Sequence, residues 1–544
     1  MTKKWLFLIF IASVLISCGK RKADLLLYNA HIYTLDSLST IAEAAIIKDG
    51  KIITTGSATQ LQATYDIAEK TDLKGAYVYP GFIDAHSHFY GLGTFNYAVS
   101  LFDISSTEDL VKKCKEFYKQ NPKPYLIGRG WDQNKFSNKQ YPDNEALSAA
   151  FPDIPVLLKR VDGHAALANR KALELANLNI QSKIDGGELL SKNGRLTGIL
   201  IDNAVEYVER IMPSFTLNEK IQALKEAQKI CFENGLSSVC DAGLEPETIM
   251  LIDSLQKSGT LDIRIYAMIA ANDKNVSEWV NKSPIKTDKL NAGSFKMYCD
   301  GALGSRGAML KKPYSDAHNH FGLFVTNAAK AEEYISKIIK SKYQLNTHCI
   351  GDSANKLILD LYAKYLQPNN DRRWRIEHAQ VLDAPDFEKF AKYKIIPSVQ
   401  PTHATSDMYW AQDRLGKERI KYAYAYKKLL DQNHWMPLGT DFPVEYVNPM
   451  YTFYAAVSRQ DAKGFPDKGF ESENALTREE ALKGMTIWAA KAAFEEHEKG
   501  SIEPGKFADF TILSLDLMQA PLLEIRNTKA LAVYVAGKKK YKLL

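Results

Sequence analysis

The sequence has little cysteine and no excess of one charge. Six cysteines are spread over 544 residues, and no two of them stand in a Cys-x-x-Cys spacing, so a disulfide framework is not expected. The formal net charge is only +6, and basic runs such as Lys538–Lys540 are short, so no nucleic-acid partner is predicted. Tandem repeats, low-complexity linkers and coiled-coil patterns are absent too, and 45% apolar with 25% charged residues is typical of a globular protein.

The N-terminal apolar run is too short to cross a membrane. Trp5–Ile16 follows Lys3 and Lys4 and as a helix would rise only about 18 Å, whereas a bilayer core measures about 30 Å. That length is typical of a secretory signal peptide, here residues 1–17. The run from Leu15 to Cys18 resembles a bacterial lipobox, which implies cleavage before Cys18 and a lipid on its thiol. A plain signal peptide with an incidental cysteine is the alternative.

A lipid on Cys18 would anchor the chain to a membrane surface without spanning the membrane. The expected location is therefore the cell envelope, with the protein anchored in the periplasm. Because Gly19 rather than aspartate follows Cys18, the outer membrane is favoured over the inner one.

Short strand-like runs alternate with helical stretches such as Leu217–Asn234 through most of the chain. The eight runs are Val78–Asp84, Leu236–Cys240, Ile263–Ile269, Ser294–Cys299, Gln344–Cys349, Trp374–His378, Ile395–Val399 and Met436–Gly439. Eight strands that alternate with helices predict an α/β fold, a (β/α)8 barrel of the TIM type, over residues 78–499.

Other parts of the chain do not fit a barrel. Residues 24–77 and 500–544 contain short alternating runs typical of antiparallel strands, with a turn at Asp49–Gly50. Neither piece is large enough to be stable alone, so we expect the two chain ends to form one small β-sandwich domain. Residues 91–230 are too long for a connection between a strand and the next. They predict an inserted α/β subdomain above the barrel, where it can cover the site.

Four of the eleven histidines end predicted barrel strands, namely His86, His88, His348 and His378. In TIM barrels this face carries the chemistry, and side chains two apart on a strand point the same way. Asp441 ends the eighth strand, and Lys296 lies on the fourth. A buried lysine is costly unless it is paired or modified. It pairs with an acid such as Asp300, or carbamylation turns it into an anionic ligand able to bridge two cations.

The motifs HSH after PGFIDA, Lys296 before DGALGSR, THCIGD, RIEHAQ and GTDFPV resemble the metal-dependent amidohydrolase superfamily. Within it, the sequence is most similar to the amidohydrolase family 3 branch, which includes enzymes resembling N-substituted formamide deformylases. The resemblance extends to the ending EPGKFADFTIL. It implies that His86, His88 and Asp441 bind a first metal, that His348 and His378 bind a second, and that a carbamylated Lys296 bridges them. One or two zinc ions fit such ligands best, with iron, manganese and nickel as alternatives.

The resemblance also suggests residues that act on a small-molecule substrate. Asp441 is the expected general base, and His164 is expected to hydrogen-bond the substrate carbonyl or the oxyanion unless it is a structural residue of its turn. Arg306, Trp131 and Asp300 are expected to contact substrate, with a loop salt bridge as the alternative for Arg306. The remaining candidates are interpreted as loop or surface residues, namely His403, His318 and His320.

The expected reaction is hydrolysis of a non-peptide carbon–nitrogen bond in an amide, formamide or cyclic amide. An ester, lactone or phosphoester hydrolase is the first alternative, because the same metal site attacks those centres and a fold does not fix the substrate. A non-catalytic, lipid-anchored binding protein is the second. Loss of a ligand would favour it, and all six expected ligands are present. Nothing in the sequence indicates which oligomeric state the protein adopts.

Overall fold

A computed structural model describes residues 20–543. The expected signal peptide, residues 1–17, and Cys18 lie outside these residues. Within the described range, no helix combines the length and the apolar character needed to cross a membrane. The five cysteines of this range are buried and form no disulfide with one another.

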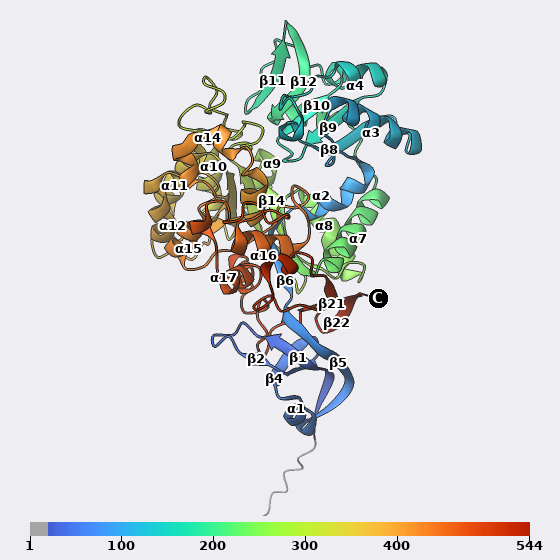
Figure 1. The fold of residues 1–544 in the computed structure, drawn as a ribbon, viewed down its shortest axis with the longest axis vertical. Coiled ribbons are helices and arrows are strands. Elements are labelled where there is room, and N and C mark those ends of the chain that lie inside the picture. Colours follow the sequence, from blue (N-terminus) through green and yellow to red (C-terminus); the bar gives the residue numbers. More distant parts are fainter. Residues whose placement is uncertain (1–19, 544) are drawn as a thin grey trace, which may run out of the picture.

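A parallel sheet fills the middle of the molecule (Figure 1). Its neighbouring strands follow the order β19–β18–β17–β16–β14–β13–β6, and each pair between neighbours is parallel. The strands are β6 (Phe82–Ser87), β13 (Leu236–Leu244), β14 (Arg264–Ala270), β16 (Leu290–Tyr298), β17 (Gln344–Cys349), β18 (Arg375–His378) and β19 (Ile396–Ser398), and the short β15 (Ile285–Lys286) pairs with the edge of β16.

The last predicted strand, Met436–Gly439, closes this sheet without forming a regular strand. The N–H of Gly439 donates to the carbonyl of Val399 at 3.0 Å, and the N–H of Ala85 donates to the carbonyl of Leu438 at 3.2 Å. Pro437 lacks an N–H and cannot donate to a ladder, which explains why only isolated bonds form here. The predicted barrel is thus confirmed as a mixed α/β fold with a nearly closed parallel sheet.

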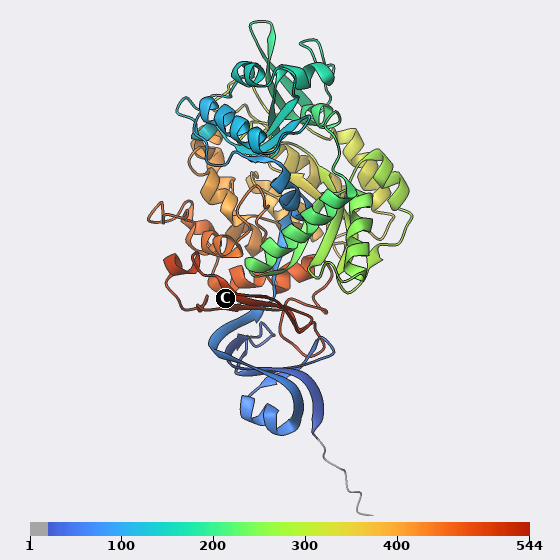
Figure 2. The same cartoon turned by 90° about the vertical axis from the view of Figure 1, so that its right-hand side faces the viewer.

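Helices follow the strands and lie around this sheet (Figures 1 and 2). The helix α7 illustrates why they form: Thr216 and Glu219 make a reciprocal capping box at its start, and its buried residues recur every three or four positions. The helices are α2 (Phe89–Thr94), α7 (Leu217–Glu233), α8 (Pro246–Lys257), α9 (Asp273–Trp279), α10 (Ala328–Ile338), α11 (Asp352–Tyr365), α12 (Phe387–Tyr393), α13 (Pro401–Asp407), α14 (Ala411–Arg419), α15 (Tyr426–Asn433), α16 (Pro449–Ser458), α17 (Arg478–Gly484) and α18 (Ile487–Ala492).

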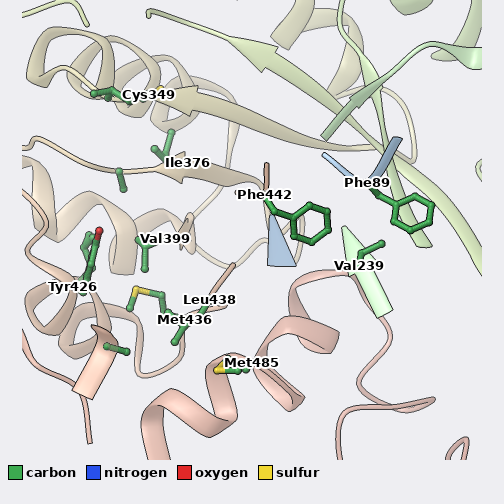
Figure 3. Close-up of a cluster of buried hydrophobic side chains, with 14 of the residues drawn as sticks. Phe89, Val239, Cys349, Ile376, Val399, Tyr426, Met436, Leu438, Phe442 and Met485 are labelled. Carbon is green, nitrogen blue, oxygen red and sulfur yellow. The ribbon is translucent and has the colours of Figure 1, made fainter. Parts of the chain in front are cut away.

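A continuous apolar core lies between the strands and the helices. Figure 3 shows part of it, with Val239 from β13, Ile376 from β18 and Leu438 from the closing segment among the labelled side chains. All three are at most 1% exposed, and full burial of such a side chain stabilises the fold by about 1.5–3 kcal/mol. This packing fixes the carboxyl ends of the strands relative to one another.

The two chain ends share one sheet. The strand β20 pairs antiparallel with β5, with Phe510 opposite Pro80 and Leu513 opposite Tyr77. The elements are β1 (Arg21–Tyr33), β2 (Ile41–Ala42), β3 (Ala44–Lys48), β4 (Lys51–Gly56), α1 (Ala58–Thr64), β5 (Tyr65–Pro80), β20 (Phe510–Leu513), α19 (Leu522–Ile525), β21 (Ala530–Val535) and β22 (Lys538–Lys542). Their grouping as a separate β-sandwich domain stays a prediction.

A third sheet lies at the opposite end of the long axis from the N-terminal strands (Figures 1 and 2). Its strand order is β11–β12–β10–β9–β8–β7. The elements are β7 (Val99–Ser100), α3 (Thr107–Gln120), β8 (Leu126–Trp131), α4 (Glu145–Ala150), β9 (Val156–Arg160), β10 (Ala165–Ala168), α5 (Arg170–Leu175), β11 (Gly187–Lys192), β12 (Arg195–Asp202) and α6 (Asn203–Glu209). They fall within residues 91–230, whose status as an inserted subdomain stays a prediction.

A buried ion pair joins the barrel to the sheet of the chain ends. Arg264, the first residue of β14, donates from Nε to Oδ2 of Asp509 at 2.6 Å and from Nη2 to Oδ1 at 2.9 Å. The two side chains are only 3% and 4% exposed. Asp509 also accepts from the N–H of Ala536 at 2.8 Å, so its carboxylate connects three segments.

We expect Asp509→Ala to lower the free energy of unfolding by about 3–5 kcal/mol, because the change leaves the Arg264 guanidinium buried without its partner. Urea denaturation followed by circular dichroism measures the loss. The control is Glu418→Ala, which breaks an ion pair with Lys421 whose side chains are 85% and 58% exposed and is expected to cost less than about 1 kcal/mol. Equal, small losses for both variants would contradict a structural role for the Arg264–Asp509 pair.

Candidate metal centre

The structure brings the six expected ligands together at the carboxyl ends of the barrel strands. Asp441 lies at their centre: its Oδ1 is 3.2 Å from Nε2 of His88 and 3.6 Å from Nε2 of His86. Nζ of Lys296 lies 3.4 Å from Nε2 of His86. Three different segments, far apart in the sequence, therefore present side chains to one point.

The two remaining histidines stand beside this group. The ring centroids of His348 and His378 are 4.5 Å apart, and those of His86 and His378 are 4.9 Å apart. His348 comes from β17 and His378 ends β18, and adjacent parallel strands end at the same edge of a sheet. The two histidine pairs thus form one cluster.

His403 belongs to the same cluster, and its interpretation as a loop residue is wrong. It lies in the first turn of α13, directly after β19. Its Nε2 is 3.5 Å from Oδ2 of Asp441, and its ring stacks on that of His378 with centroids 5.7 Å apart. The available signal was its place just beyond a predicted barrel strand, because the loops at that end form the active face of such barrels.

Buried polar groups orient the imidazole rings. Nδ1 of His86 is 2.5 Å from Oε2 of Glu377, and Nδ1 of His378 is 2.7 Å from Oε1 of Gln400. Burial alone would raise the pKa of Glu377, but the charge and hydrogen bond of His86 outweigh it and lower the pKa. Such partners fix the tautomer of a histidine and leave Nε2 free to bind a metal.

The electrostatics keep His88, His348 and His378 neutral and Asp441 ionised. Burial lowers the pKa of His88 to about 4 and lowers those of His348 and His378 well below the ordinary value. For Asp441, burial opposes ionisation, but the close imidazoles of His88, His86 and His378 hold the pKa well below its usual range. Neutral imidazole and carboxylate are the forms that bind zinc.

Two buried atoms show that the cluster fits a metal ion. Within residues 20–543, Oδ1 of Asp441 and Nε2 of His403 have no hydrogen-bond partner, and a buried polar atom without a partner is costly. The polar atoms nearest to Asp441 Oδ1 and His403 Nε2 are close, but they are not oriented for hydrogen bonds with them. Ligand atoms around one metal ion have the same arrangement. Two sets offer atoms within 4.8 Å of one another and share Asp441: His86 with His88, and His378 with His403.

The backbone is strained at the same place. His378 and Asp441 have φ values of 71° and 64°, in the left-handed region that residues with a Cβ seldom adopt. Each such residue costs about 1–3 kcal/mol, and residues of this kind concentrate at functional sites. The surrounding core therefore holds two metal-site residues in conformations that they do not prefer.

Lys296 lies fully inside this cluster, with Nζ 4.6 Å above the ring of Tyr298. Burial is the main influence on its amine and lowers the pKa. The alternative ion pair with Asp300 is not formed in the described structure. Asp300 instead accepts hydrogen bonds of 2.8–3.0 Å from the backbone N–H groups of three loop residues, Met309, Ile350 and Gly351.

A cavity of about 880 Å³ opens onto the cluster. The cluster's side of it includes His88, Lys296, His348, His378 and Asp441, and the opposite wall comes from the sheet of β7–β12, with Arg129, Arg160 and His164 among its residues.

His164 lines this space close to the metal ligands, and its role toward a substrate stays a prediction. Its Nδ1 is 2.7 Å from Oδ1 of Asp202, and its ring centroid is 4.8 Å from that of His348. Burial lowers the pKa of His164, but the carboxylate of Asp202 outweighs this and the net shift is upward.

The other expected substrate contacts lie outside the cavity lining. Trp131 is fully buried in the apolar core beneath β8, and its Nε1 donates to the carbonyl of Leu158 at 2.7 Å. Arg306 makes the alternative loop salt bridge, with two bonds of 2.8 and 3.2 Å to Asp316. The side chain of Asp300 is fully buried and holds the backbone N–H groups described above.

His318 and His320 lie in the turn of Asp316, away from the cluster, and Nε2 of His320 is 2.7 Å from the carbonyl of Arg306.

We expect Glu377→Gln to lower metal affinity about 10- to 100-fold, because an amide no longer fixes the ring of His86 as a carboxylate does. Zinc titration of metal-free protein measures the change. The matched control is Asp241→Asn, at another buried carboxylate beside the cavity, which within the described residues accepts only from the backbone of Phe89 and Tyr90; this variant is expected to bind zinc normally. Wild-type affinity in Glu377→Gln would contradict the orienting role.

Comparison with known proteins gives consistent matches along the chain. The amidohydrolase family model matches residues 69–541. The chain is 34% identical to Protein LONG AFTER FAR-RED 3 of Arabidopsis thaliana over 95% of this chain and 92% of that protein. It is 32% identical to Putative amidohydrolase YtcJ of Bacillus subtilis (strain 168), with coverages of 92% and 97%. For the N-substituted formamide deformylase of Arthrobacter pascens, the identity is 26% and the coverages are 95% and 98%.

A solved structure also resembles the whole chain. It is an uncharacterized metal-dependent hydrolase from Pyrococcus horikoshii OT3, with a TM-score of 0.74 and 28% sequence identity. The match covers 92% of this chain and 99% of that one.

Proposed function

The chain belongs to the amidohydrolase family, and we propose that it is a metal-dependent hydrolase that cleaves a non-peptide carbon–nitrogen bond in a small amide, formamide or cyclic amide. The observation that carries this proposal is the convergence of buried imidazoles on Asp441 at the end of a cavity of about 880 Å³. The resemblance to an enzyme named N-substituted formamide deformylase supports the type of bond.

We assign the ligands of one ion to His86, His88 and Asp441, and those of a second ion to His348 and His378. Burial lowers the pKa of Lys296, which favours a neutral amine; such an amine can add to CO2 and lose a proton, and the resulting carbamate would supply an anionic oxygen ligand to bound metal. One or two zinc ions suit this donor set. A bound ion supplies Lewis acidity, which lowers the pKa of water to about 7 and polarises a carbonyl oxygen.

Asp441 is placed to handle the proton. Its carboxylate is ionised and has an oxygen without a hydrogen-bond partner in the described chain. It accepts the proton of the attacking water and delivers it to the leaving nitrogen, as a general base and then a general acid. His164 faces it from the opposite wall. Asp202 occupies its Nδ1, so its Nε2 can donate to the substrate carbonyl as negative charge develops there.

The two alternatives are weaker on this geometry. An ester, lactone or phosphoester hydrolase would use the same groups, but no residue of the described cavity favours those substrates over amides. A binding protein without catalysis has no need of strained backbone at His378 and Asp441, which costs stability. The hydrolase is therefore preferred.

We expect Asp441→Asn to lower kcat about 10²- to 10⁴-fold, the usual contribution of a general base. The assay screens zinc-loaded protein against N-formyl, N-acyl and cyclic amides for release of amine, and circular dichroism checks the fold. Glu206→Gln, a change at another carboxylate of the cavity wall, is the control and is expected to stay active. A chelator should abolish turnover and added zinc restore it. Near-wild-type activity in Asp441→Asn would contradict the assignment of Asp441 as the general base.

We also propose that Cys18 carries a lipid anchor in the periplasm, on the strength of the lipobox-like run from Leu15 to Cys18. A single lipidated cysteine binds a membrane surface and does not span the membrane. In a bacterial host, the full chain should fractionate with membranes and Cys18→Ala should appear in the soluble fraction. Ser17→Ala, a neighbouring change that keeps the thiol, is the control. Membrane association of Cys18→Ala would exclude the anchor.

A further inference from the structure

Arg129 is a positively charged residue of the cavity wall to which neither the metal site nor the proposed mechanism gives a role. It lies on β8 and lines the cavity. Its Nη2 donates to the carbonyl of Val161 at 3.1 Å, whereas its Nε is fully buried and has no partner within residues 20–543. No carboxylate of these residues lies within the ion-pair distance of 4.0 Å from its guanidinium.

Two other cations of the wall have carboxylate partners. Arg160 pairs with two aspartates, Asp132 and Asp162, and Lys159 pairs with Glu209 at 2.5 Å. Lys135 is exposed to solvent, and its Nζ contacts the carbonyl of Phe102 at 3.3 Å. Lys296 also lacks a carboxylate partner in the described chain, but an amine can lose its proton when buried, whereas a guanidinium stays charged.

The guanidinium of Arg129 is held in a defined place. The loop after β9 crosses it at Gly163, where a Cβ would meet Nη2 at 3.2 Å, and Gly163 has a φ of +78° that favours glycine. On the other side, β8 pairs with β9 along its length, with Arg129 opposite Lys159. A long side chain fixed in this way loses little freedom when it binds a ligand.

The charge of Arg129 acts on the same space as the metal ligands. Burial lowers the pKa of its guanidinium, and the charge of Asp441 is the largest influence in the opposite direction. A cation that is partly removed from water and has no carboxylate in direct contact is costly. The buried charge of Arg129 becomes favourable when an anion enters the cavity and accepts hydrogen bonds from the guanidinium N–H groups.

Other carboxylates of the wall limit where an anion can sit. Asp407 and Glu445 line another part of the cavity, where burial raises the pKa of Asp407 to about 7 and also raises that of Glu445. An anionic group of a substrate is disfavoured beside Asp407 and Glu445 and favoured beside Arg129. This difference orients a substrate that carries one anionic group.

We propose that Arg129 is a specificity-determining residue that binds a carboxylate of the substrate, so that the preferred substrates are N-formyl or N-acyl amino acids rather than neutral amides. This inference rests on the proposed amide hydrolysis. A guanidinium binds a carboxylate through two parallel N–H···O bonds, which are stronger than bonds between neutral groups. The anchored carboxylate then positions the amide carbonyl toward the metal ligands.

The test compares acids with neutral substrates of the same size. The probes are N-formylphenylalanine and its C-terminal primary amide, together with the N-acetyl pair. The wild-type kcat/KM is expected to be at least about tenfold higher for the acids. In Arg129→Gln this preference should disappear, with a loss of about 10²-fold for the acids and little change for the amides, because a lost charged hydrogen bond costs mainly the substrate that made it. Arg129→Lys should restore part of it.

The matched control is Lys135→Gln, which removes the same charge from an exposed part of the wall and should leave the acid-to-amide ratio unchanged. Equal losses for acids and amides in Arg129→Gln, or no preference for acids in the wild type, would overturn the proposal while leaving amide hydrolysis intact.

Failure of the wild type to turn over any probe would instead overturn the proposed function, and binding then decides the subsite. The melting temperature is measured with and without N-formylphenylalanine and its amide. Stabilisation by the acid alone, lost in Arg129→Gln and kept in Lys135→Gln, supports the carboxylate site. Equal stabilisation by both probes, or none, overturns it. If Arg129→Gln does not fold, Arg129→Lys serves, with reduced stabilisation by the acid as the supporting result.

Discussion

The hydrogen bond of 2.7 Å from the N–H of Asp441 to the carbonyl of His86 is the interaction on which the site depends. It joins the first barrel strand to the segment that closes the barrel, and in doing so places the Asp441 carboxylate between two imidazoles. Around it, β16, β17 and β18 bring Lys296 and the other histidines to the same edge. Closure of the sheet and assembly of the cluster are therefore one event, and the apolar core outside the strands stabilises both.

The sequence alone predicted those features that depend on short-range pattern. Gln344–Cys349 matches β17 residue for residue, and the histidines at strand ends meet because parallel strands end together. The sequence-based predictions failed for residues whose role depends on their contacts in the folded protein. His403 was missed because it follows its strand on a helix, where alternation gives no signal. Arg306 and Trp131 have side chains suited to substrate binding. However, Arg306 is paired with Asp316 and Trp131 is packed in the core beneath β8, and neither contact can be predicted from the neighbouring sequence.

The cavity separates two tasks between two parts of the chain. The barrel edge holds the groups suited to a metal ion and to proton transfer, on strands whose positions the core fixes. The sheet of β7–β12 supplies the opposite wall, with His164 and Arg129. Groups on that wall can vary without disturbing the metal ligands, which is how one fold accommodates many substrates. The proposed carboxylate site is one such variable element.

The shared sheet of the two chain ends has a consequence for how the protein comes into being. The strand β5 obtains its partner on one edge from β20, and nearly the whole chain lies between them. A growing polypeptide therefore carries an unpaired edge on β5 until β20 has been synthesised, and exposed edges of this kind recruit other chains into aggregates. A chain that stops before β20 therefore leaves one edge of β5 without its partner.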